Sequence, residues 1–335
     1  MTKLLEVHNT TKRFHSGPIW QRETTVAVDQ LSFSLSDEHP AITGVVGESG
    51  SGKTTLALMV MGNVRPDEGQ VIYRGKDLAR MSSQERMQFR REVQPIFQDP
   101  FAAFNPFYQV DHVLTTPLAR FGLAASTKDA THRIHEALEL VGLRPAETLG
   151  RFPHQLSGGQ RQRIMVARAL LCKPKLIIAD EPVSMVDASL RATILAGLQR
   201  LNRELGISIL YITHDLTTAY QVCDNMMVMY AGSVVEVGAA DKIIRNPQHP
   251  YTQLLISSIP DVDRSHRWED ESAGELRHAG RQVTGCKFAP RCRWAEESCW
   301  QAMPPLYQPE PDRAVACVLH RQSMVLEQQD TARVL

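Results

Sequence analysis

Alternating apolar and polar residues near the start of the chain predict β-strands. Residues 4–46 show this alternation repeatedly, as in the run Leu-Ser-Phe-Ser-Leu at 31–35. Successive side chains of a strand point to opposite faces of a sheet, so the alternation places the apolar side chains on one buried face. We therefore expect short antiparallel strands here. The run Val-Ile-Tyr at 71–73, followed by Gly75, predicts a further strand and a turn.

Helical patterns dominate the middle of the chain. Residues 53–62 and the charged residues 82–92 are expected to form helices, and helical patterns prevail from about 100 to 170. From 176 to 238, strand and helix patterns alternate, which indicates a parallel sheet. Four prolines are expected to break the long helical stretch: Pro106, Pro117, Pro145 and Pro153.

The character of the chain changes after about residue 245. Residues 246–252 are punctuated by prolines, and residues 261–282 are polar and charged, as in a linker. Residues 285–320 then hold four of the six cysteines. The other two, Cys172 and Cys223, lie in apolar runs and are expected to be buried thiols of the core.

Composition limits the class of protein. The 335 residues can form one large domain with an extension, or two domains. Lys and Arg together number 37, as do Asp and Glu, and a net charge of zero argues against a nucleic-acid partner. No segment has the roughly 18 apolar residues of a membrane span, and the N-terminus lacks the apolar core of a secretory signal. We therefore expect a cytoplasmic protein.

The segment 47–54 carries the most specific chemistry. It reads Gly-Glu-Ser-Gly-Ser-Gly-Lys-Thr and follows an apolar run at 41–46. Its glycines allow backbone N–H groups to approach phosphate oxygens, and the helix after it directs its positive end at an anion. Lys53 can reach the β and γ phosphates, and the Thr54 hydroxyl can ligate Mg²⁺. The segment therefore predicts binding of a nucleoside triphosphate.

Two acidic residues and a glycine pair lie further along. Residues 156–160 read Leu-Ser-Gly-Gly-Gln and precede a helical stretch. The apolar run 176–179 ends in Asp180 and Glu181, and Ser-Met-Val-Asp follows at 184–187. Paired carboxylates after a buried strand suit a metal and a water that attacks a phosphate.

Two more segments complete the pattern. A second apolar strand, 207–212, ends in Thr-His-Asp at 213–215, and Gln98 lies in Ile-Phe-Gln-Asp-Pro at 96–100. In this order and at these distances, the segments resemble the ATP-binding subunits of ABC transporters. Within that family the chain resembles the subunits of oligopeptide/dipeptide importers, from about residue 4 to about residue 320.

The resemblance implies a fold and a division into domains. It implies an α/β P-loop ATPase core of the ABC type, with an antiparallel β subdomain, an inserted helical subdomain and a small Cys-containing C-terminal extension. The nucleotide-binding domain would span 1–245, with the helical subdomain at about 95–170, and the extension would span 246–335. We expect the ATP site to lie on a domain separate from the cysteines.

The resemblance also implies roles for the residues of the site. Asp180 would assist Mg²⁺, Glu181 would polarise the attacking water, and His214 would hold the γ-phosphate and orient Glu181. Gln98 would contact Mg²⁺ and sense the γ-phosphate, and Lys53 would act in catalysis. The residues expected around the phosphates are Gly47, Glu48, Ser49, Gly50, Ser51, Gly52, Lys53, Thr54 and Thr55.

In this family two ATPase subunits pack head to tail. Ser157, Gly158, Gly159 and Gln160 would cover the ATP held by a second subunit, identical or related, and Asp187 would lie at the same interface. The residues before Asp187 depart from the commonest pattern, since Met185 and Val186 replace a small residue and a leucine. We expect altered packing against the partner there, with function retained.

The implied partners are membrane proteins. Two transmembrane permease subunits would carry the solute, fed by an extracytoplasmic solute-binding protein, and the ATPase would bind peripherally at the cytoplasmic face of the plasma membrane. Residues 101–110 would meet the permease. The adenine would stack on Phe14, with Trp20 as a weaker candidate.

The C-terminal cysteines predict a metal site. Cys286, Cys292, Cys299 and Cys317 lie within 32 residues, and a reducing compartment disfavours disulfides. Some subunits that the chain resembles hold [4Fe–4S] in a similar cluster. Zinc sites of four cysteines usually contain Cys-x2-Cys pairs, which are absent here, so the resemblance favours [4Fe–4S], with zinc as the alternative.

Two other functions are compatible with the core motifs. One is a soluble ABC-type ATPase of phosphonate degradation or another non-transport complex, although those subunits lack the cysteine tail. The other is a DNA-repair or translation ATPase, which typically has two ATPase cores or long coiled coils. The transported solute cannot be read, because its contacts lie on other chains.

Overall fold

The computed structural model describes residues 2–17, 23–99, 104–184, 186–259, 284–326 and 334. Four predicted features lie outside the described residues: Trp20, Met185, the first residues, 101–103, of the segment expected to meet the permease, and the expected linker at 261–282. Within the described part, no helix is both long and apolar enough for a bilayer.

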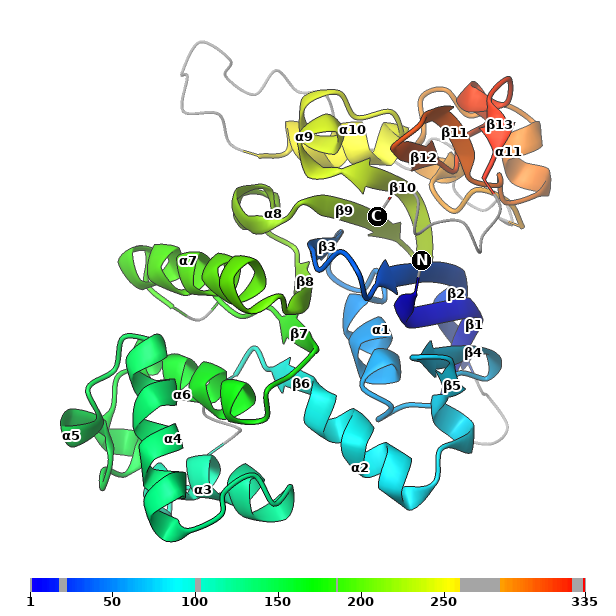
Figure 1. Ribbon diagram of the computed structural model, residues 1–335. Helices are drawn as coiled ribbons and strands as arrows, with labels where there is room; N and C mark the ends of the chain where they lie inside the picture. Colours follow the sequence, from blue (N-terminus) through cyan, green and yellow to red (C-terminus); the bar gives the residue numbers. More distant parts are fainter. Residues whose placement is uncertain are drawn as a thin grey trace.

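A mixed sheet forms the centre of the molecule (Figure 1), with strand order β13-β11-β12-β10-β9-β3-β8-β7-β6. The pairs β9–β3, β3–β8, β8–β7 and β7–β6 are parallel, as the alternation of strands and helices predicted. Both β3 and β8 are buried along their whole length, which is typical of parallel strands covered on both faces. The nine strands are β3 (Ile42–Val46), β6 (Val93–Ile96), β7 (Leu176–Asp180), β8 (Ser208–Thr213), β9 (Asn225–Tyr230), β10 (Ser233–Ala239), β11 (Tyr307–Glu310), β12 (Arg313–Val315) and β13 (Met324–Val325).

A second, antiparallel sheet lies beside the first, with strand order β2-β1-β4-β5. The predicted antiparallel pairing is present, but β1 and β2 are not short: each has 14 residues. Repeated register shifts bend the pair and interrupt the alternation of apolar and polar residues. The sequence pattern therefore predicted several short strands where the structure has two long ones. Helix α1 packs between the two sheets (Figure 1). The elements are β1 (Lys3–Ser16), β2 (Glu23–Ser36), β4 (Glu68–Tyr73), β5 (Lys76–Asp77), α1 (Lys53–Val60) and α2 (Ser83–Glu92).

Four helices form a separate group next to β6 (Figure 1), around their own apolar core. They are α3 (Asp111–Arg120), α4 (Thr127–Leu140), α5 (Pro145–Thr148) and α6 (Gly158–Leu171). Pro145 begins α5, as a helix start allows, but Pro117 lies inside α3 rather than ending it. The buried Leu114 and Leu118 on either side of Pro117 anchor α3, which offsets the hydrogen bond that the proline removes.

The C-terminal part continues the central sheet. Strand β12 pairs with β10, with Val315 opposite Glu236 and Arg313 opposite Gly238. The expectation that the ATP site lies apart from the cysteine tail is therefore wrong, because the tail shares a sheet with the nucleotide-binding strands. The domain boundaries themselves stay predictions. The remaining helices are α7 (Ala188–Leu205), α8 (Leu216–Val222), α9 (Ala240–Arg245), α10 (Pro250–Ser257) and α11 (Ser298–Gln301), with short 3-10 turns at Leu78–Arg80, Pro153–Gln155, Ala289–Arg291 and Val318–His320.

Candidate nucleotide site

The glycine-rich loop lies between the buried strand β3 and helix α1, as the sequence predicted. Gly47, Gly50 and Gly52 all have positive φ, at 152°, 81° and 100°. A Cβ at Gly47 would lie 2.2 Å from the Met229 carbonyl oxygen, and one at Gly52 would lie 2.1 Å from the Ala27 carbonyl oxygen. Two of the glycines are thus required by close backbone approach, which holds the loop in a tight curve.

Lys53 is the first residue of α1 and folds back over the loop. Its Nζ donates to the carbonyl oxygens of Gly47 and Glu48, both at 2.8 Å. Burial lowers the pKa of Lys53, while the carboxylates of Glu181, Asp180 and Glu48 act in the opposite direction. A buried ammonium surrounded by carbonyl oxygens is a ready partner for an anion that enters the loop.

Asp180 ends β7 and points toward the start of α1. Its carboxylate is hydrogen-bonded by the Thr54 side chain, and burial, followed by the charge of Glu181, raises its pKa. Its Oδ1 is buried and has no hydrogen-bond partner in the part of the chain that the structure describes. A carboxylate with an unsatisfied oxygen beside a hydroxyl is the donor set that Mg²⁺ prefers, so Thr54 and Asp180 fit the predicted metal.

Glu181 and His214 are brought together at the ends of two neighbouring strands. Strands β7 and β8 are parallel, with Asp180 opposite Ile212. Glu181 Oε1 accepts from the His214 backbone N–H at 2.9 Å and lies 2.5 Å from His214 Nδ1. Glu181 also has a left-handed φ of 50°, which is strained for a residue with a side chain. The structure therefore fixes the direction of this carboxylate.

Gln98 follows a strand that neighbours the one ending in Asp180. It follows β6, whose Ile96 is paired with Ala179 of β7, and its side chain is exposed. The parallel arrangement places Gln98, Glu181 and His214 at the same edge of the central sheet, since each follows the carboxyl end of its strand.

Ser157, Gly158, Gly159 and Gln160 begin α6. The Ser157 hydroxyl accepts from the Gln160 N–H at 3.2 Å, and Gln160 Oε1 accepts from the Ser157 N–H at 2.9 Å. Strands β8 and β7 separate β6, on which α6 packs, from β3 and its loop. Ser157 is exposed, so this segment can meet a ligand held by another molecule.

Asp187 and Phe14 complete the predicted set. Asp187 precedes the first turn of α7 and is exposed. A Cβ at Gly159 would lie 2.5 Å from Leu190 Cδ1, so α7 and the start of α6 lie against each other. Phe14 is 43% exposed on β1, and an adenine could stack on it.

The four C-terminal cysteines line one cavity together with His249. The cavity has a volume of about 10 Å³, which is the room of one water molecule. Burial raises the pKa of Cys286 to about 11 and that of Cys317 to about 12, and the neighbouring thiols add to the shift. Thiol donors suit iron–sulfur or zinc, but no group of three or more His, Cys, Asp or Glu in the described ranges is arranged to hold a metal. The structure thus leaves the metal site without support. As expected, Cys172 and Cys223 are buried in the apolar core.

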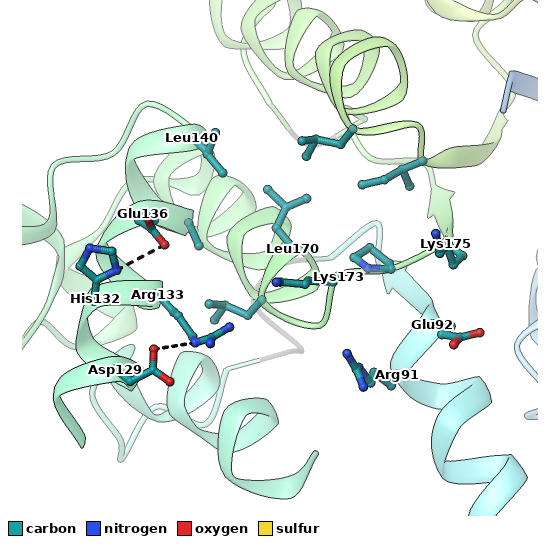
Figure 2. A pocket seen from close by; sticks show the side chains of 15 residues that line it. Arg91, Glu92, Asp129, His132, Arg133, Glu136, Leu140, Leu170, Lys173 and Lys175 are labelled. Carbon is teal, nitrogen blue, oxygen red and sulfur yellow. Dashed lines mark hydrogen bonds and ion pairs between the residues drawn. The ribbon is translucent and has the colours of Figure 1, made fainter. Parts of the chain in front are cut away.

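A wide cavity lies elsewhere, between α2, α4, α6 and the loop before β7 (Figure 2). It has a volume of about 790 Å³. Figure 2 shows that several of its charged side chains face one another, and Arg133 Nε lies 2.9 Å from Asp129 Oδ1. None of the predicted site residues lines it. The nucleotide site is therefore identified by its loop and carboxylates rather than by cavity size.

Sequence reasoning missed two residues that contact the loop. Tyr251, on α10, accepts from the Glu48 N–H at 2.9 Å, and Arg291 lies 3.1 Å from the Glu48 carboxylate. No local sequence pattern pairs either residue with Glu48, because both lie more than 200 positions from it in the chain.

Comparisons with known proteins agree with this geometry. The family model described as ABC transporter matches residues 28–184, and the model for the oligopeptide/dipeptide transporter C-terminal region matches residues 235–299. The chain is 40% identical to the oligopeptide transport ATP-binding protein OppF of Salmonella typhimurium, covering 86% of each chain. It is 39% identical to the dipeptide transport ATP-binding protein DppF of Haemophilus influenzae, covering 87% of this chain and 88% of that one.

A solved structure shows the same core. The dimeric ATP-binding cassette MJ0796, in a post-hydrolysis state bound to ADP and phosphate, aligns with a TM-score of 0.63 and 26% identity. The alignment covers 70% of this chain and 98% of that one. The chain therefore belongs to the ATP-binding proteins of ABC transporters, in the oligopeptide/dipeptide branch of that family.

Proposed function

We propose that the chain is the ATPase subunit of a peptide-type ABC importer, which binds and hydrolyses Mg-ATP to drive uptake. The observation that carries the proposal is the joint position of three groups: the loop at 47–54, the buried Asp180 with an unsatisfied oxygen, and the Glu181–His214 pair. The matched oligopeptide/dipeptide C-terminal region supports an importer over a phosphonate-degradation ATPase.

The residues of the site divide the work of phosphoryl transfer. The loop N–H groups and the Lys53 ammonium bind the phosphates, and Thr54, Asp180 and Gln98 hold Mg²⁺, which supplies charge that neutralises the phosphates. The Glu181 carboxylate orients and polarises the attacking water. His214 fixes Glu181 in position and contacts the γ-phosphate, and Phe14 stacks on the adenine.

Two subunits complete each other's sites. Ser157 and Asp187, which are both exposed, close together with residues 158–160 of one subunit over ATP held in the loop of the other. Closure then requires nucleotide, and hydrolysis opens the pair again. The likeness to a dimeric cassette supports this arrangement. The subunits bind at the cytoplasmic face of the membrane, to two permease subunits supplied by a solute-binding protein, and residues 104–110 contribute to the permease contact.

The substitution Glu181→Gln tests the proposal. It keeps the shape of the side chain and removes the charge that polarises water. ATPase activity of the assembled transporter should fall by about 10²- to 10³-fold, while ATP binding is retained. The closed dimer should accumulate with ATP, visible by size-exclusion chromatography. ATPase activity near that of the wild type would refute the role of Glu181.

We also infer a metal role for the cysteine tail, on the chemistry of the four thiols rather than on any ion geometry. Cys286, Cys292, Cys299 and Cys317 would hold [4Fe–4S], with zinc as the alternative. Anaerobic purification should yield a brown protein with iron and acid-labile sulfide, whereas zinc would leave it colourless. Cys292→Ser should lose the metal and loosen residues 285–320. Protein without iron or zinc, and with four freely alkylated thiols, would reject the inference.

A further inference from the structure

The C-terminal part of the chain holds the second residue of the phosphate-binding loop at two points. Arg291 Nη1 lies 3.3 and 3.1 Å from the two carboxylate oxygens of Glu48, and Nη2 lies 3.3 Å from Oε1. The Glu48 N–H donates to the Tyr251 hydroxyl at 2.9 Å. The backbone and the side chain of Glu48 are thus both fixed by residues more than 200 positions away in the sequence.

Arg291 and Tyr251 are themselves held by packed aromatic rings. The guanidinium of Arg291 lies 5.6 Å from the Phe288 ring and 5.8 Å from the Tyr230 ring. The Tyr251 ring lies 4.5 Å from that of Tyr230 and 5.5 Å from that of Phe288, and Tyr251 is completely buried. A cation above aromatic faces has few alternative positions, so Arg291 is pre-positioned toward Glu48.

The same rings border the cysteine cavity. Phe288 lines that cavity along with Cys286 and His249, and Arg291 directly precedes Cys292. His249 Nδ1 accepts from the Tyr251 N–H at 3.0 Å. A continuous series of contacts therefore joins the cysteines, the aromatic rings and the phosphate-binding loop.

The ion pair between Arg291 and Glu48 affects nucleotide binding through the charge of Glu48. Glu48 places a carboxylate in a loop that must receive a polyphosphate, and like charges repel. Its position near the phosphate site is visible in its electrostatic effect on Lys53. Arg291 forms a bidentate contact that neutralises Glu48, and so removes this repulsion.

We propose that Arg291 and Tyr251 are positioning residues for the nucleotide, which act through Glu48 and make nucleotide affinity depend on the C-terminal part. The proposal rests on the ATP binding proposed above. It adds that the C-terminal part regulates the affinity for nucleotide. Loosening of the tail, for example by Cys292→Ser, should then weaken nucleotide binding. This replaces our expectation from sequence that the ATP site lies on a domain separate from the cysteines.

The test measures nucleotide affinity in four variants of the full chain, Arg291→Gln, Tyr251→Phe, Glu48→Gln and the double variant Arg291→Gln/Glu48→Gln. The matched control is Arg321→Gln, which breaks an exposed ion pair with Glu296 inside the tail, at 2.6 Å, away from the loop. Dissociation constants for ATP and ADP are measured by titration with Mg²⁺ present. Melting temperatures show whether each variant is folded.

Arg291→Gln should raise the Kd for ATP about three- to tenfold, and Tyr251→Phe about threefold, the sizes typical of a partly exposed ion pair and of one hydrogen bond. Arg321→Gln should leave Kd unchanged. The Kd of the double variant should lie within about twofold of that of Glu48→Gln alone. Once the Glu48 carboxylate is removed, Arg291 has no negative charge to neutralise in the loop. In the assembled transporter, KM should rise and kcat stay near that of the wild type.

Three outcomes would overturn the inference. One is wild-type affinity in folded Arg291→Gln and Tyr251→Phe, and another is strict additivity in the double variant. The third is an equal loss in Arg321→Gln, which would indicate a general effect of the tail on stability. If Arg291→Gln does not fold, the nucleotide affinities of Glu48→Gln and Tyr251→Phe are used to test the inference. Lys53→Ala separates the two proposals: unchanged nucleotide affinity in that variant would reject the 47–54 loop as the ATP site, whatever the Arg291 and Tyr251 variants show.

Discussion

At the scale of single residues, the site keeps groups in conformations and surroundings that cost stability. Asp180 has a buried oxygen without a partner in the described chain, and Glu181 has a left-handed backbone. Only 7% of the surface of Lys53 is exposed to solvent. Such costs are common at functional sites, because the ligand supplies the missing interactions when it binds.

Asp180→Asn should therefore stabilise the nucleotide-free protein. The pKa of Asp180 is raised above 3.8, mainly by burial, so the folded chain holds this proton more tightly than the unfolded chain does. The protonated Asp180 carboxyl therefore stabilises the folded protein at low pH. This contribution is lost as the pH rises from 3.8 through the raised pKa of the folded state, and the charged carboxylate is unfavourable at neutral pH. We expect the melting temperature at pH 7 to rise by about 2–4 °C, the shift that roughly 1 kcal/mol gives.

The gain should shrink below pH 4, where Asp180 is protonated in both states, and scanning calorimetry across pH checks this. Nucleotide affinity in Mg²⁺ should fall in the same variant. A lower melting temperature at pH 7 than that of the wild type would contradict the argument.

At the scale of elements, sequence predicted those that depend on local signals. The β3–loop–α1 unit carries its apolar run and its glycines within a few residues, and the strands that end in Asp180 and Thr213 each carry an apolar run with a polar end. The bent hairpin of β1 and β2 was misread, because its register shifts hide the period of two. The pairing of β10 with β12 could not be predicted, because no local pattern selects a partner so far along the chain.

The contact between Glu48 and Arg291 was missed for the same reason. It joins residues 243 positions apart, and no local pattern in the sequence pairs Glu48 with Arg291. Sequence motifs can therefore propose residues for the ATP site, whereas long-range contacts to those residues become visible only when the sheet is assembled.

Gly50 and Gly52 of the loop give a prediction for this element. Gly52→Ala should strongly reduce both stability and nucleotide binding, because its Cβ would lie 2.1 Å from the Ala27 carbonyl oxygen, and a backbone atom cannot move aside cheaply. Gly50→Ala is the matched control: its φ is also positive, but its Cβ would have open space. The control should cost only about 1 kcal/mol of backbone strain. Thermal melts compare the two, and equal losses would show that φ alone decides.

At the scale of the whole molecule, the residues proposed for the ATP site lie on surfaces that one copy does not bring together. The loop follows β3, whereas Ser157 begins a helix that packs on β6, with β8 and β7 between these strands. Ser157 and Asp187 are both exposed. Because this exposed, reciprocally capped helix start is separated from the loop of its own chain by two strands, we propose a nucleotide held by a partner as its target.

This arrangement predicts complementation between two defective copies. Lys53→Ala removes charge from the loop and should weaken nucleotide binding itself. Ser157→Arg should leave binding in place and block closure by steric bulk at the interface. Each variant alone should lose ATPase activity in the assembled transporter, for these different reasons. If the subunit pairs with itself, a mixed pair contains one site with both defects and one site with neither.

Mixing the two variants during assembly should therefore restore ATPase activity to a substantial fraction of the wild-type value, since the intact site combines the loop of the Ser157→Arg copy with residues 157–160 of the Lys53→Ala copy. A double variant carrying both changes in one chain, mixed with itself, is the control and should stay inactive. Assembly with a related but different subunit would give no restoration, and tagged copies would then fail to co-purify as a pair. Co-purifying copies that remain inactive, or loss of nucleotide binding in Ser157→Arg, would show that each chain builds its site alone.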